Sequence, residues 1–148
     1  MTMQLIKTDI SQLTREISRK LDTILLPVSD ENNLTIMKLK VLAEIHKNKK
    51  MTIGDLGNVL GVAGGNISNM CKTLEIEGYI ERKRSVKDER VVHVSLTSKG
   101  KSVLANVNKQ LSDKYEKFDK QIPKEDIETI ISGLNMLNGY LDELLTLR

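Results

Sequence analysis

Hydrophobic residues recur every three or four positions through most of the chain, and this spacing predicts a mainly helical protein. The first segment predicts one long amphipathic helix that ends near Pro27, because proline disfavours a helix interior. The apolar positions of this first stripe are Ile6, Ile10, Leu13, Ile17, Leu21 and Ile24. A second helix is expected from Leu34 to Ile45, before the polar run Lys47–Lys50.

Two short helices with a glycine-containing turn between them follow this polar run. Thr52 lies three positions before Asp55, a spacing typical of a helix that begins with a capping box, and Gly61 is expected to end that helix. The next helix has its apolar face at Ile67, Met70, Cys71 and Leu74, and it is expected to end near Gly78. This order of elements predicts a helix-turn-helix motif.

The hydrophobic period then changes from that of a helix to that of a strand. Val92, Val94 and Leu96 alternate with more polar residues, which predicts a strand, and residues 79–82 are a suitable partner. Ser85–Arg90 then forms the tip of a hairpin. A basic hairpin directly after a helix-turn-helix predicts a wing.

The remaining residues predict two further helices. Thr97 is expected to cap the first of them, and Pro123 suits the first turn of the second. Their apolar positions are Val103, Val107, Leu111, Tyr115, Phe118 and Ile122, and then Ile127, Ile130, Ile131, Leu134, Leu137, Leu141, Leu144 and Leu145. A central core of about fifty residues has too little surface to cover the stripes at both ends of the chain, so we expect a second copy of the chain to cover them.

Composition and charge add a candidate partner to this pattern. The 148 residues fit one domain, and the hydrophobic fraction of 39% is sufficient for a packed core. The net charge of +3 decides little by itself. The positions of the charges matter more, because basic residues gather in the hairpin and in a second cluster at residues 46–50. Such local basic patches favour a polyanion such as DNA.

The exposed face of the second short helix carries the candidate base-reading residues. These are Asn66, Ser68, Asn69, Lys72 and Thr73, whose side chains suit hydrogen bonds to base edges or phosphates. A solvated helix face explains any one of them nearly as well. Together they favour DNA, because no acidic residue interrupts the segment 66–73.

The wing supplies a second set of candidate DNA-binding residues, namely Arg82, Arg84, Lys87, Asp88 and Arg90. Arg90 suits the narrow, electronegative minor groove, and Asp88 is placed to hold its guanidinium. The alternative is a solvated loop with a surface ion pair of little energetic value. The position of the loop directly after a helix-turn-helix favours DNA.

Other classes of protein and site find little support. No apolar run is long enough to span a bilayer, no signal-peptide pattern is present, and one cysteine fits a reducing cytosol, so we expect a cytoplasmic protein. The sequence has no catalytic constellation, and His46, His93 and Cys71 lack metal-site spacing, so neither an enzyme nor a metal or other cofactor is expected. Cys71 is interpreted as an inert core thiol, with an oxidant-sensing thiolate as the alternative.

Three segments resemble the MarR family of winged helix-turn-helix regulators. They are LEIEGYIER at 74–82, DER at 88–90 and LTSKG at 96–100, which occur in the order and at the spacing typical of that family. The resemblance implies that residues 66–73 enter the major groove and that Arg90, braced by Asp88, enters the minor groove. It places Arg82 near the DNA backbone or the base of the wing. Gly64-Gly65 departs from the family pattern at the start of the recognition helix.

The resemblance also implies how the chain is organised. A single unit spans 1–148, with a winged-helix core at about 34–96 and dimerisation helices at 1–33 and 97–148. The implied function is a homodimeric transcriptional regulator, usually a repressor, that binds a pseudopalindromic operator and is released by a small ligand between its two regions. The alternative is a winged helix used only for protein–protein contact.

Overall fold

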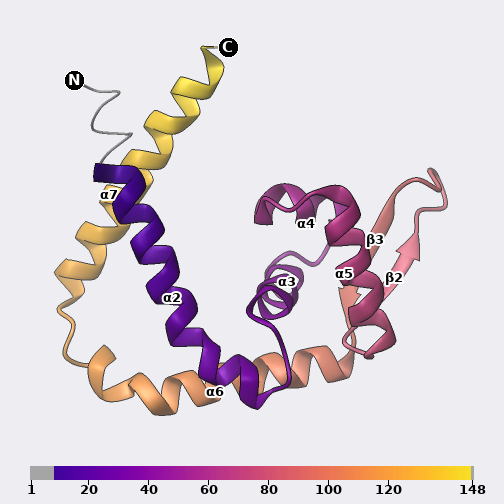
Figure 1. Cartoon of the computed structure of the whole chain (residues 1–148), viewed down its shortest axis with the longest axis horizontal. Helices are drawn as coiled ribbons and strands as arrows, with labels where there is room; N and C mark the ends of the chain where they lie inside the picture. The colour runs from indigo at the N-terminus through magenta and orange to yellow at the C-terminus, as the bar shows by residue number, and fades with distance from the viewer. Residues whose placement is uncertain (1–8, 148) are drawn as a thin grey trace. The chain divides into compact units, whose positions relative to one another are not determined.

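The computed structural model describes residues 9–147, so Ile6 of the first apolar stripe lies outside the described residues. The chain divides into two compact units, with the boundary after Gln110. The first unit contains a small sheet and most of the helices, and the second contains the end of α6 and all of α7 (Figure 1). The elements are α2 (Ser11–Glu31), α3 (Ile36–Lys47), β1 (Met51–Thr52), α4 (Ile53–Leu60), α5 (Gly64–Ile76), β2 (Ile80–Arg84), β3 (Val92–Leu96), α6 (Ser98–Asp119) and α7 (Lys124–Thr146).

Helix α2 does not end at Pro27, and that prediction was wrong. The helix continues to Glu31 because its last turn is anchored: Val28 and Ser29 are buried, and the Ser29 hydroxyl donates to the Leu26 carbonyl oxygen at 2.9 Å. The helix ends at Glu31 with Asn32 as its C-cap, and Asn33, the next residue, adopts a left-handed conformation with φ 55°. The N–H of Leu34 donates to the carbonyl oxygen of Ser29, which completes a Schellman motif.

The predicted helix-turn-helix is confirmed in its caps as well as its order. The Thr52 hydroxyl accepts from the Asp55 N–H at 3.0 Å, and the Asp55 carboxylate accepts from the Thr52 N–H at 3.1 Å. Gly61 ends α4 with φ 65°, a conformation that favours glycine. Helix α5 follows directly after a short turn.

The wing belongs to a three-stranded antiparallel sheet with the order β1-β3-β2. The predicted hairpin is confirmed, with Ile80 opposite Leu96 and Arg84 opposite Val92. Strand β1 was not predicted, because its two residues are too few to show an alternation. It pairs Met51 with Val94 on the other edge of β3.

The core of the first unit lies between α3, α4, α5 and the sheet. Leu42, Leu56, Ile67 and Leu74 are fully buried, and Ile80 of β2 is 1% exposed. Burial of aliphatic side chains of this size contributes about 1.5–3 kcal/mol each. The hydrophobic effect therefore holds α5 and the base of the wing in the same core.

Helix α6 begins where the sequence predicts. The Thr97 hydroxyl accepts from the Gly100 N–H at 3.1 Å and donates to the Gly78 carbonyl oxygen at 2.6 Å. Gly100 also lies against the backbone of Tyr79, whose carbonyl oxygen would overlap any Cβ at this position. Glycine is therefore required where α6 passes the end of α5.

Helix α7 carries an apolar stripe that its own unit leaves uncovered. None of its residues is buried, and Ile130 and Leu134 are 59% and 55% exposed. In α2, Leu13 and Leu21 are 57% and 56% exposed. Across residues 9–147, no helix has both the length and the apolar character required to cross a membrane.

Candidate nucleic-acid interface

Helix α5 presents the predicted base-reading residues on its accessible face. Asn66, Asn69, Lys72 and Thr73 are exposed, and Ser68 is half-buried. On the opposite face Ile67, Cys71 and Leu74 are fully buried, whereas Met70 is only half-buried. The two faces of the helix therefore separate as the apolar spacing predicts.

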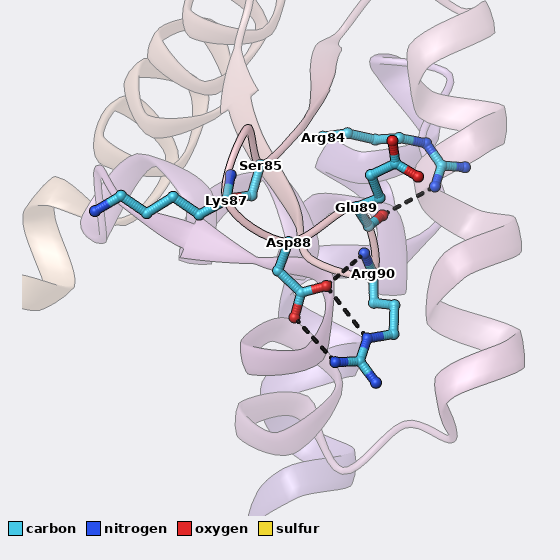
Figure 2. Close-up of polar contacts among 6 residues, drawn as sticks. All are labelled: Arg84, Ser85, Lys87, Asp88, Glu89 and Arg90. Atoms are coloured by element: carbon cyan, nitrogen blue, oxygen red, sulfur yellow. Dashed lines mark hydrogen bonds and ion pairs between the residues drawn. The ribbon is translucent and has the colours of Figure 1, made fainter.

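The tip of the wing is held by its own hydrogen bonds (Figure 2). The Ser85 N–H donates to the Val91 carbonyl oxygen at 2.8 Å, and the Val91 N–H donates to the Asp88 carbonyl oxygen at 3.0 Å. Arg84 donates from Nη1 to the Glu89 carbonyl oxygen at 3.0 Å. These bonds close the loop and give it a defined shape.

Arg90 is placed by Asp88, as the sequence predicts. The Asp88 Oδ1 atom accepts from the Arg90 N–H at 3.0 Å and from Nε at 3.2 Å. The Arg90 side chain nevertheless remains 91% exposed. In Figure 2 the Lys87 side chain extends away from this pair, so the tip presents cations in two directions.

A hollow of about 460 Å³ brings the wing and the recognition helix together. Its lining includes Arg90 and Val92 from the wing and Gly64 and Ser68 from α5. Asn58 of α4 and Thr52, the residue directly before α4, also line this hollow. Arg90 and Ser68, which are distant in the sequence, therefore border the same space.

A second hollow, of about 550 Å³, lies along the other side of α5. Asn66, Asn69 and Thr73 line it together with Thr35 and Lys38 from the start of α3. Lys38 forms an ion pair with Glu77 at 2.7 Å. The sequence did not single out Thr35 or Lys38, because only the fold brings the start of α3 to this side of α5.

Arg82 differs from the other wing residues because its charge is already paired. Its guanidinium donates from Nη2 and Nε to Glu75 Oε1 at 3.0 and 3.2 Å. Glu75 belongs to α5, so this pair is visible only once the structure shows that α5 contacts β2. The structure therefore places Arg82 at the base of the wing, one of the two locations that the family resemblance offers.

Cys71 lies away from this interface. Its side chain is fully buried, and burial raises the pKa of its thiol above the ordinary value. Within the described range 9–147, no three His, Cys, Asp or Glu side chains gather in a way that would hold a metal ion.

Comparison with known proteins places this geometry in a family. Residues 23–107 match the family described as transcriptional regulator SarA/Rot. The HTH-type transcriptional regulator SarZ of Staphylococcus saprophyticus is 31% identical over 133 residues, which cover 88% of this chain and 86% of the relative.

Solved structures agree with the fold. FabT of Streptococcus pneumoniae in complex with DNA is similar with a TM-score of 0.69 and 25% identity, covering 92% of this chain and 99% of that one. A mutant MarR of E. coli in complex with operator DNA has a TM-score of 0.74 and 24% identity, covering 90% and 96%. The family consists of transcriptional regulators rather than enzymes, in agreement with the absence of a catalytic motif from the sequence. The chain therefore belongs to the SarA/Rot family of transcriptional regulators and has a MarR-type winged-helix fold.

Proposed function

We propose that the protein regulates transcription in the bacterial cytoplasm by binding duplex DNA, with α5 in the major groove and the wing in the adjacent minor groove. The observation that carries this proposal is the shared hollow between Arg90 and Ser68. It places an exposed wing arginine and the acid-free face of α5 on one surface. Base edges in the major groove and the negative potential of the minor groove are the features that these two elements suit.

Within this interface we assign different tasks to the exposed residues. Asn69 and Lys72 are exposed and carry side chains able to pair with adenine and guanine, respectively. Lys87 and Arg84 lie on the wing and suit phosphate oxygens. Arg90 takes the minor groove, because Asp88 holds it without burying it.

The regulator is proposed to act as a homodimer, usually as a repressor. The apolar stripes of α2 and α7 support this assignment, because a second copy offers a matching apolar surface to each. A two-fold dimer would place its recognition helices about 34 Å apart, one turn of DNA. The operator is then a pseudopalindrome.

A small organic anion is proposed as the effector. Ile45, His46, Lys49, Ser95, Leu96 and Lys101 line a hollow of about 490 Å³ where α3, β3 and α6 meet. Its aliphatic side chains suit an apolar body, and its lysines suit a carboxylate. A thermal-shift titration with benzoate tests this, and Lys101→Ala should reduce the shift.

The DNA-binding proposal is tested by selection from a random duplex library with the full-length protein. We expect recovery of an inverted-repeat motif, protected in a footprint on both half-sites. A winged helix used only for protein contact would recover no motif and would lose all DNA binding in the presence of competitor DNA.

A further inference from the structure

An ion pair joins the recognition helix to the wing. Glu75 lies in the last turn of α5, and Arg82 lies in the middle of β2. The Glu75 Oε1 atom accepts from Arg82 Nη2 at 3.0 Å and from Nε at 3.2 Å, and Oε2 accepts from the Arg82 backbone N–H at 2.9 Å. One carboxylate therefore holds both the side chain and the backbone of the strand.

The pair is partly shielded and stays charged. The side chains of Arg82 and Glu75 are 25% and 37% exposed. The hydrogen bond from the Arg82 side chain, followed by the one from its backbone, lowers the pKa of Glu75 below its ordinary value. Arg82 therefore has its charge neutralised inside the protein, unlike Arg90, which is 91% exposed.

The pair lies at the base of the wing, so a change there also moves the tip of the wing. The chain reverses between α5 and β2 at Gly78, where φ is 85°, and Arg82 then pairs with Val94 of β3. A strand rises about 3.3 Å per residue, so β2 carries the chain roughly 7 Å past Arg82 to its end at Arg84, and the tip of the wing follows beyond it. A rotation of about 10° at the base would move the end of β2 by roughly 1 Å, enough to weaken a hydrogen bond at the tip.

We propose that Glu75 and Arg82 are positioning residues that fix the wing at the spacing at which α5 and Arg90 engage DNA together. Arg82 itself does not contact the DNA. This inference rests on the proposed DNA-binding function and adds to it a residue on α5 that acts through the wing.

The sign of one substitution distinguishes this role from simple electrostatics. Loss of a negative charge beside DNA strengthens binding, because the polyanion is repelled less. Loss of a positioning carboxylate weakens binding, because Arg90 is no longer held at its groove. Glu75→Gln should therefore reduce affinity, although it makes the protein more basic.

The experiment uses the full-length protein and a duplex that the wild type selects from a random library, with dissociation constants from fluorescence anisotropy. We expect Glu75→Gln to weaken binding by about fivefold, and by no more than Arg90→Ala. The reason is that a misplaced Arg90 cannot lose more affinity than the complete removal of its side chain. The matched control is Glu77→Gln. It removes the same charge from the same end of α5, but Glu77 pairs with Lys38 of α3 and not with the wing. The affinity of the Glu77→Gln variant for the duplex should be unchanged or higher.

Two further measurements separate positioning from a general structural role. In the Arg90→Ala background, Glu75→Gln should have no additional effect, because no arginine remains to be aimed. Amide exchange should become faster at residues 84–91 in Glu75→Gln and stay the same in α3. If Glu75→Gln does not fold, as judged by circular dichroism, Arg82→Lys takes its place, since it keeps the charge but loses the planar fork.

Unchanged or tighter binding by Glu75→Gln, or a loss that adds fully to that of Arg90→Ala, overturns the positioning role alone. If the wild type selects no sequence from the library, the DNA-binding function itself fails, and the role of the pair fails with it.

Discussion

Asp88 holds Arg90 at two points: its Oδ1 atom accepts hydrogen bonds from the Arg90 backbone N–H at 3.0 Å and from Nε at 3.2 Å. The Arg90 side chain is 91% exposed, so the pair adds little to the stability of the fold. In the proposed DNA complex, the pair would restrict the arginine before DNA binds and so reduce the conformational entropy lost on binding.

Asp88→Ala should therefore weaken DNA binding, but less than Arg90→Ala, because the arginine remains and is only less well placed. The matched control is Glu89→Ala, which removes the same charge from the same loop while leaving the Glu89 carbonyl that Arg84 contacts. Anisotropy should show weaker binding for Asp88→Ala and equal or tighter binding for Glu89→Ala. If both variants bind more tightly, only the charge of the loop matters and the brace has no role.

The exposed face of α5 should control sequence preference, because base edges carry the code and phosphates do not. Asn69→Ala and Lys72→Ala should each relax the selected motif at defined base pairs. Lys109→Ala, on the exposed side of α6, serves as the control and should leave the motif unchanged. Selections that recover the wild-type motif with both α5 variants would contradict the placement of this face.

The apolar stripe of α7 should be required for dimerisation. Leu134→Asp combined with Leu141→Asp places two charges on the stripe and should give monomer or aggregate in sedimentation velocity at micromolar concentration. Thr129→Asp combined with Ser132→Asp adds the same charges on the opposite side of the helix and should leave the dimer intact. A wild-type protein that sediments as a folded monomer would contradict the dimer directly.

Cys71 should not act as an oxidant sensor. Its thiol is fully buried and its pKa is raised, so little reactive thiolate is available at neutral pH. Cumene hydroperoxide should leave DNA affinity unchanged, and labelling by iodoacetamide should require denaturant. Rapid labelling of the folded protein, together with loss of DNA binding after oxidation, would reverse this interpretation.

Local sequence signals predicted the elements well because they act over short distances. Thr52 with Asp55, Gly61 and Thr97 each marked a helix end that the structure contains. The end predicted at Pro27 was wrong, because burial of Val28 anchors the last turn of α2 and the left-handed turn at Asn33 comes only after the C-cap Asn32.

Long-range relationships were not available from these signals. The residues of the wing were identified, but the partner of Arg82 was not, because only packing brings Glu75 beside β2. The same reason hid strand β1, whose pairing with β3 depends on contact between distant segments.

The most direct test of DNA binding through helix and wing is the dissociation constant of Arg90→Ala measured against salt concentration. We expect binding to weaken by about 1–3 kcal/mol, the range of a good groove contact. The plot of log affinity against log salt should become less steep by about one unit, since each neutralised phosphate releases about one counterion. Circular dichroism should be unchanged, because the tip buries little apolar surface. A folded Arg90→Ala protein with the affinity and salt slope of the wild type would contradict the account and favour a protein-interaction role for the wing.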